Sequence, residues 1–182
     1  MAATHGPVAA GGTAAPTGRI EVPTAADMHA LGRRLAAVLR AGDLVVLSGP
    51  LGAGKTTLVQ GLGAGLGVRG PVTSPTFVIA RVHPALNGGP GLVHVDAYRL
   101  ASVAEVDDLD LDASLDDCVT VVEWGEGLVE GLAADRLEVT IGMSPAGPGT
   151  ESRTVGMTGV GERWETAAES VCCGLPVTPE GL

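Results

Sequence analysis

The sequence of 182 residues has little of several residue types, and aromatic side chains are the clearest case. It contains only four of them: Phe77, Tyr98, Trp124 and Trp164. Hydrophobic residues still make up 45% of the chain, so the core of one globular domain has to be built from Leu, Val, Ile and Ala. Against that background, the place of each aromatic residue is informative.

Positive charge is also scarce, because 11 basic residues stand against 21 acidic ones and the formal net charge is −10. Nucleic-acid binding relies on basic side chains, usually gathered in a patch, that neutralise phosphates. The sequence shows no such patch. We therefore expect any role in nucleic-acid metabolism to act through a partner, with the nucleic acid contacted only indirectly.

Cysteine is limited to Cys118, Cys172 and Cys173, which are too few and too poorly spaced for a disulfide framework or a zinc site. The first 18 residues lack the charged start and the apolar core of a signal peptide. No apolar run approaches the 18 residues of a membrane-spanning helix. The sequence therefore predicts a cytoplasmic protein that does not use a membrane.

Hydrophobic patterning predicts one α/β domain over residues 19–173, between a disordered N-terminal tail (1–18) and a flexible C-terminal tail (174–182). The predicted sheet is mixed and mainly parallel, is flanked by helices and includes an antiparallel hairpin. The predicted strands are 19–22, 44–48, 77–83, 92–98, 119–124, 136–141 and 152–160. Four helices are predicted. The first follows a capping box at residues 24–27, the second begins near residue 54, and the other two cover 101–117 and 162–173.

The stretch from Gly49 to Thr56, GPLGAGKT, matches the phosphate-loop pattern G-x-x-x-x-G-K-[ST] in full. Backbone N–H groups of such a loop form an anion nest, and the following helix adds its positive N-terminal end. Lys55, the only lysine of the chain, would reach the β- and γ-phosphates of a nucleotide as a point charge, a task unsuited to the planar fork of arginine. An apolar strand before the loop and an amphipathic helix after it support the match. The predicted ATP-binding residues of this stretch are Pro50, Leu51, Gly52, Ala53, Gly54, Lys55, Thr56 and Thr57.

A phosphate loop also needs an acid that helps to hold the metal and a group that positions the nucleophile. Thr56 offers a hydroxyl to Mg²⁺, and Glu123, which ends the strand VTVVE, is its natural acidic partner. Asp96 ends the strand LVHVD and is the other candidate. Either acid alone could be an ordinary strand-end carboxylate, but two of them beside a phosphate loop favour a functional role.

Four blocks in this order resemble the TsaE (YjeE) family, the small P-loop ATPases of bacterial tRNA threonylcarbamoyladenosine synthesis. They are GPLGAGKTT, SPTF at 74–77, HVDAYRL at 94–100 and VVEWGE at 121–126, and the similarity spans residues 20–141. Phosphate loops are common, but the other three blocks together are specific. The family often has a tyrosine where this chain has His83, which we expect to be a surface residue at a strand end rather than a metal ligand.

The resemblance implies roles for individual residues. Lys55 and Asp96 would be the catalytic residues, with Asp96 near the γ-phosphate to orient or activate water. Thr56 and Glu123 would hold Mg²⁺. The segment 74–77 would form a loop like a switch segment near the nucleotide, with Thr76 as its polar contact. The residues that would support the site or face a partner are Ser74, Tyr98, Arg99 and Trp124.

The resemblance also implies Mg²⁺-dependent ATP binding and slow hydrolysis, coupled to a complex of the TsaB and TsaD proteins. TsaD would transfer the threonylcarbamoyl group to adenosine 37 of ANN-reading tRNAs. The present protein would use its ATP cycle to reset or drive that complex, and its net charge of −10 agrees with leaving contact with tRNA to the partners.

Two other functions stay open at the level of sequence. A small-molecule kinase would use the same loop, although its arginine-bearing lid has no clear counterpart here. A nucleotide-gated binding module could dock through the acidic segment 101–117, although a solvated helix face explains that segment better. A GTPase is excluded more sharply, because its guanine-reading motif N-K-x-D needs a second lysine.

Overall fold

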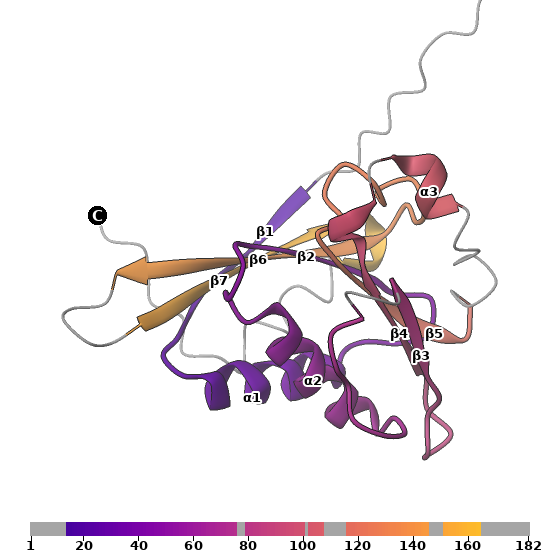
Figure 1. Ribbon diagram of the computed structural model, residues 1–182, viewed down its shortest axis with the longest axis horizontal. Coiled ribbons are helices and arrows are strands. Elements are labelled where there is room, and N and C mark those ends of the chain that lie inside the picture. The colour runs from indigo at the N-terminus through magenta and orange to yellow at the C-terminus, as the bar shows by residue number, and fades with distance from the viewer. Residues whose placement is uncertain (1–13, 76–78, 101, 108–115, 146–150, 165–182) are drawn as a thin grey trace, which may run out of the picture.

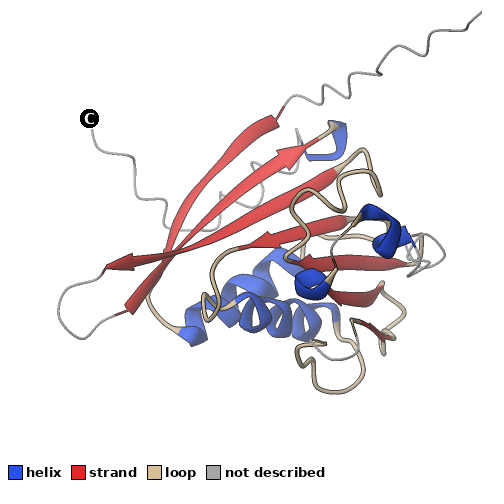
Figure 2. Cartoon of the chain, turned by 45° about the horizontal axis from the view of Figure 1, so that its top comes forward, coloured by secondary structure: helices blue, strands red, loops and turns tan. Residues whose placement is uncertain are grey.

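The computed structural model describes residues 14–75, 79–100, 102–107, 116–145 and 151–164. These residues form a seven-stranded sheet with two long helices on one face and a short helix on the other (Figures 1 and 2). The strands are β1 (Ala14–Val22), β2 (Leu44–Ser48), β3 (Ala80–His83), β4 (Gly91–Asp96), β5 (Cys118–Glu123), β6 (Arg136–Pro145) and β7 (Glu151–Val160). The helices are α1 (Ala25–Ala36), α2 (Lys55–Leu66), the 3₁₀ turn η1 (Ala97–Arg99) and α3 (Val103–Asp107).

The strand order is β1-β7-β6-β2-β5-β4-β3. The four central strands, β6, β2, β5 and β4, are parallel, whereas β3, β7 and β1 are added to the two sides by antiparallel pairing. The α/β class and the mixed sheet predicted from the sequence are confirmed, as is the β3–β4 hairpin. The parallel character is confined to the centre, since three of the six pairings are antiparallel.

Several predicted boundaries need correction. Strand β4 ends at Asp96, where the turn η1 begins, and β6 continues to Pro145 instead of ending at residue 141. Strand β1 begins at Ala14 rather than at Arg19, so residues 14–18, which we assigned to a disordered tail, are part of a strand paired with β7. Composition alone suggested the tail, but backbone pairing with a neighbouring strand does not depend on apolar side chains. Of the residues predicted to form an acidic helix, 101–117, residues 103–107 form α3 and residues 116–117 form a turn instead of a helix. Residues 101 and 108–115 lie outside the described residues.

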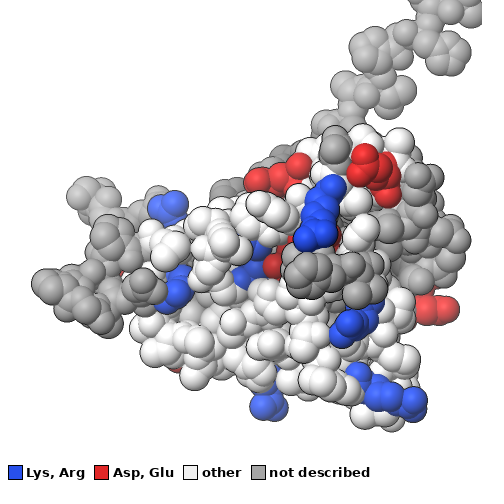
Figure 3. Space-filling view, in the orientation of Figure 1, with Lys and Arg blue, Asp and Glu red and all other residues white. Residues whose placement is uncertain are grey.

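The central strands are buried on both faces, which explains their continuous apolar sequence. Val45 and Leu47 of β2 pack in the larger core against α1 and α2, whereas Leu44 and Val46 pack in a smaller core on the opposite face. Val106 of α3 belongs to that smaller core. The described basic side chains on the face seen in Figure 3 are scattered, as the sequence predicts. Among the described helices, none is long and apolar enough to cross a membrane.

Helices α1 and α2 approach each other so closely that their contact has room only for glycine. A Cβ atom added to Gly61 of α2 would overlap the carbonyl oxygen of His29 in α1. A Cβ on Gly32 of α1 would likewise overlap the carbonyl oxygen of Leu58 in α2. Glycines that weaken α2 as an isolated helix therefore let it pack against α1.

The end of the described chain is fixed to the start of β2. Arg163 donates through Nε and Nη2 to the two carboxylate oxygens of Asp43, at 3.1 and 3.0 Å, and through Nη2 to the carbonyl of Val38 at 2.7 Å. Trp164, the next residue, is fully buried in the larger core. Of the predicted helix over 162–173, residues 162–164 are described and are helical.

The glycine contact makes a prediction about stability. Gly61→Ala would gain about 1 kcal/mol of helix propensity if the site were exposed. At the contact with His29 we expect the opposite sign, a net loss of about 1–3 kcal/mol, because the new methyl group meets backbone that cannot rotate away. Urea unfolding measures the change. Gly131→Ala, at an open position without such a contact, is the matched control, and equal effects of the two substitutions would contradict the prediction.

Candidate active site

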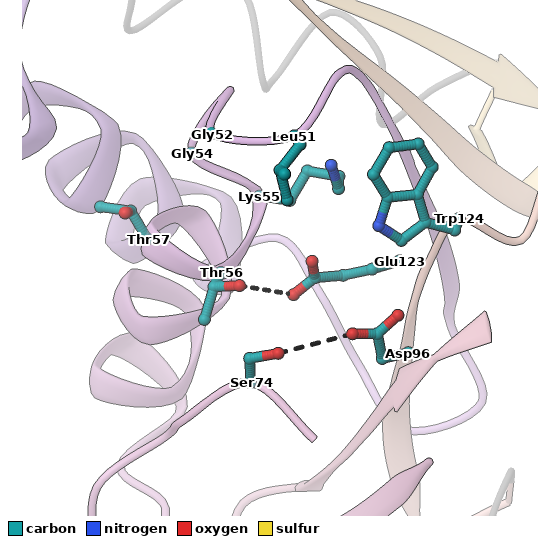
Figure 4. A pocket seen from close by; sticks show the side chains of 10 residues that line it. All are labelled: Leu51, Gly52, Gly54, Lys55, Thr56, Thr57, Ser74, Asp96, Glu123 and Trp124. Carbon is teal, nitrogen blue, oxygen red and sulfur yellow. Dashed lines mark hydrogen bonds between the residues drawn. The ribbon is translucent and has the colours of Figure 1, made fainter. Parts of the chain in front are cut away.

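The parallel centre of the sheet places three chain segments at one edge. Strands β2, β4 and β5 all end there, at Ser48, Asp96 and Glu123, and the phosphate loop follows β2 directly. The carboxyl ends of parallel strands are where open α/β sheets bind ligands. A pocket of about 270 Å³ lies at this edge. Its lining residues, drawn in Figure 4, are Leu51, Gly52, Gly54, Lys55, Thr56, Thr57, Ser74, Asp96, Glu123 and Trp124.

The phosphate loop turns directly into the N-terminus of α2. Gly54 is the N-cap residue and has a φ of 106°, a conformation that residues with a side chain rarely adopt. Within the loop, the N–H of Ala53 donates to the carbonyl of Pro50 at 3.1 Å. The first turn of α2 therefore points its free N–H groups and its positive end toward the pocket.

Lys55 is nearly buried at the centre of the pocket wall, with 5% of its surface exposed. Its Nζ donates to the carbonyls of Gly49 and Pro50 at 2.7 and 3.1 Å and lies 3.8 Å from the centre of the Trp124 ring. Burial lowers the pKa of Lys55, while the carboxylates of Glu123 and Asp96 act in the opposite direction. The amine thus contacts two backbone carbonyls and an aromatic face, and the charges of two carboxylates act on it.

Thr56 and Glu123 meet across the pocket although they are far apart in sequence. The Thr56 hydroxyl donates to Oε1 of Glu123 at 3.0 Å (Figure 4). A hydroxyl beside a carboxylate is the oxygen-rich pair that suits Mg²⁺, which also keeps waters and binds phosphate oxygens. The described residues hold no group of three or more His, Cys, Asp or Glu that could form an all-protein metal cage. The hydroxyl–carboxylate pair fits Mg²⁺ bound together with a phosphate.

His94 also contacts Glu123, and sequence reasoning assigned it no role. It lies on β4, is fully buried, and has its Nε2 2.8 Å from Oε1 of Glu123. The signal was present, since His94 begins the block HVDAYRL and is polar within an otherwise apolar run. What the sequence could not show was that β4 and β5 are neighbours, which brings this ring against that carboxylate.

Asp96 is held at the end of β4 by contacts from two sides. Its Oδ1 accepts the N–H of Tyr98 at 3.1 Å and caps η1, and its Oδ2 accepts the hydroxyl of Ser74 at 3.4 Å. Its own N–H donates to the carbonyl of Ile79, whose φ of 70° is unusual for a β-branched residue. The carboxylate thus connects the strand end to the segment around Ser74, as Figure 4 shows.

Trp124 follows Glu123 in a strained conformation, with a φ of 63°. Its N–H donates to the carbonyl of Leu47 at 3.0 Å, which continues the pairing of β5 with β2. Its ring packs at 5.4 Å from that of Tyr98, which is 65% exposed. The bend at Trp124 turns the indole back over Lys55 instead of continuing the strand.

The structure brings together most residues that the sequence singled out. Pro50, Ala53, Tyr98 and Arg99 are not among the pocket-lining residues; Ala53 is buried within the loop, and Tyr98 lies beside Trp124. Thr76 lies outside the described residues. His83 ends β3, as expected, but the expectation that it lies at the surface was wrong: it is buried, with 4% exposed, and burial lowers its pKa.

Comparison with known proteins identifies the family. The family model described as "Threonylcarbamoyl adenosine biosynthesis protein TsaE" matches residues 22–151. The chain belongs to the TsaE family. The resemblance found in the sequence is therefore confirmed, and with it a place in the biosynthesis of threonylcarbamoyladenosine in tRNA.

Individual TsaE proteins are similar over most of their length. The chain is 66% identical over 148 residues to the tRNA threonylcarbamoyladenosine biosynthesis protein TsaE of Streptomyces coelicolor, which covers 81% of this chain and 100% of that one. It is 36% identical over 146 residues to the protein of the same name from Bacillus subtilis, covering 80% and 87% of the two chains. The crystal structure of Bacillus subtilis YdiB matches with a TM-score of 0.67 and 30% identity, over 86% of this chain and 94% of that one.

The two roles of Asp96, as a charge and as a cap, can be separated by substitution. Asp96→Asn keeps an Oδ1 that accepts the N–H of Tyr98, so we expect stability close to that of the wild type. Asp96→Ala loses this cap and should lower the free energy of unfolding by about 0.5–2 kcal/mol. Urea unfolding of both variants makes the measurement. A loss in Asp96→Asn as large as in Asp96→Ala would show that the charge, and not the cap, stabilises this edge.

Proposed function

We propose that the protein is a Mg²⁺-dependent ATPase that acts with the TsaB and TsaD proteins in the threonylcarbamoylation of adenosine 37 of ANN-decoding tRNAs. The observation that carries the proposal is the meeting of Thr56 with Glu123 at the start of α2, beside Lys55 and at the end of the parallel strands. Membership of the TsaE family supports a role of this site in threonylcarbamoyladenosine biosynthesis. The partners and the hydrolysis are part of the proposal.

In this proposal, the residues of the loop bind the triphosphate and the residues at the strand ends hold the metal. A bound Mg²⁺ would neutralise charge on the β- and γ-phosphates. Thr56 and Glu123 would hold it, because a hydroxyl and a carboxylate already converge there. Lys55 would exchange its bonds to the Gly49 and Pro50 carbonyls for phosphate oxygens, a short movement of a flexible side chain.

Asp96 would orient and activate the water that attacks the γ-phosphate. It lines the same pocket as Lys55 and Glu123, and its Oδ2 contacts the hydroxyl of Ser74. A carboxylate held in this way can orient a water molecule and accept its proton.

The experiment that tests the function is ATP hydrolysis by the purified chain, alone and with the TsaB–TsaD pair and tRNA of the same cell. We expect slow turnover alone that rises when the pair is added. Turnover that ignores the pair would leave the nucleotide site in place and overturn the assignment of partners. Transfer of labelled γ-phosphate to an added small acceptor, instead of to water, would indicate a kinase.

A single substitution tests the role of the lysine. Lys55→Ala should lower ATP turnover about 10²–10³-fold, since stabilisation of charge on the transferred phosphate is the main catalytic term in such sites. The control is Arg33→Ala, which removes an exposed positive charge of α1 and should leave turnover unchanged. Normal turnover in Lys55→Ala would remove the basis for the site.

A further inference from the structure

We propose that His94 is a positioning residue, which holds the Glu123 carboxylate in the orientation that receives the metal of the nucleotide complex. The inference rests on the proposed function, because it concerns the same site. It assigns the buried imidazole a task that neither the phosphate-loop motif nor the contacts of Thr56 supply.

The geometry is fixed by neighbouring parallel strands. His94 lies on β4 in register with Val121 of β5, and Asp96 lies in register with Glu123. The imidazole Nε2 is 2.8 Å from Oε1 of Glu123, and both residues are almost fully buried, with 0% and 3% exposed. Short, buried hydrogen bonds to a charged group are strong and directional. The contact therefore restrains the carboxylate far more than an exposed side chain could.

The chemistry of the two groups fixes the donor. An ionised carboxylate only accepts hydrogen bonds, so the imidazole must carry its hydrogen on Nε2 and donate it to Glu123. The other ring nitrogen, Nδ1, is buried and has no hydrogen-bond partner in the part of the chain that the structure describes. Among the described residues, Glu123 is thus the polar partner of this ring. The other buried residues at positions 92, 93 and 95 of β4 are Leu, Val and Val, so packing alone calls for an apolar residue here.

Two donors converge on one oxygen of the carboxylate. Thr56 Oγ1, on α2, and His94 Nε2, on β4, both contact Oε1, at 3.0 and 2.8 Å. Both of these hydrogen bonds end on Oε1, and none of the described residues donates a hydrogen bond to Oε2. The pair of donors restrains Oε1 and leaves Oε2 for the ion. Partners of this kind, one step removed from a metal, typically change its affinity 10–100-fold when they are removed.

The test compares three substitutions with a matched control. His94→Leu removes the donor. His94→Gln restores it, because the Gln Nε2 is as many bonds from the backbone as the His Nε2, whereas the shorter His94→Asn does not reach. His83→Leu is the control, because it removes a second buried histidine, on β3, that does not line the pocket. The readout is the binding of Mn²⁺ in the presence of a non-hydrolysable ATP analogue, followed by electron paramagnetic resonance. Binding of the analogue in EDTA reports the nucleotide site without metal.

We expect His94→Leu and His94→Asn to weaken Mn²⁺ binding about 10–100-fold, and His94→Gln to stay within about threefold of the wild type. Binding of the analogue in EDTA should not change, and His83→Leu should match the wild type in both assays. In the wild-type protein, ¹⁵N spectra of the imidazole should show the hydrogen on Nε2. If His94→Leu does not fold, the contrast between Gln and Asn decides.

Four results would overturn the inference: wild-type Mn²⁺ affinity in His94→Leu or His94→Asn, no rescue by His94→Gln, an equal loss in His83→Leu, or a hydrogen on Nδ1. Each of them leaves the proposed function intact if the wild type hydrolyses ATP in a Lys55-dependent way. A wild-type protein that shows no metal-dependent binding of the analogue would overturn the inference and the proposed function together.

Discussion

The carboxylate of Glu123 is the interaction on which the candidate site depends. It ends β5, accepts the hydroxyl of Thr56 from the first turn of α2, and contacts His94 of β4. Three elements that are distant in sequence are thereby tied to one buried charge. A buried charge is tolerated only when it is hydrogen-bonded and balanced by an opposite charge. Here the positive charge of Lys55 lies close enough for Glu123 to raise the pKa of that lysine against the effect of burial.

That arrangement requires the axis of α2 to keep a fixed position relative to the sheet. The helix begins at Lys55, so any shift of its axis would move Thr56 away from Glu123. Its axis is set by the contact with α1, where Gly32 and Gly61 allow the two backbones to touch. The glycines lower the helix propensity of α2, and packing against α1 offsets this loss. The same packing fixes the position of the phosphate loop at the N-terminal end of the helix.

Sequence reasoning predicted the parts of the fold that follow from local signals. The apolar run at 44–48, the glycine loop and the capping box at Thr24 each found their expected structure. It failed where long-range pairing decides, as at β1, whose first residues pair with β7 despite a composition typical of disorder. His83 and His94 show the same limit, because burial of a polar ring depends on which strands are neighbours.

The scarcity of positive charge in the sequence extends into the pocket. Lys55 is the only basic residue among those that line it, against the two carboxylates of Asp96 and Glu123. A triphosphate brings several negative charges, so this pocket would repel the nucleotide unless other positive groups offset them. The N–H groups of the loop and the end of α2 supply one part. A divalent ion at Thr56 and Glu123 would supply the rest, so in such a pocket the metal would strengthen the binding of the nucleotide.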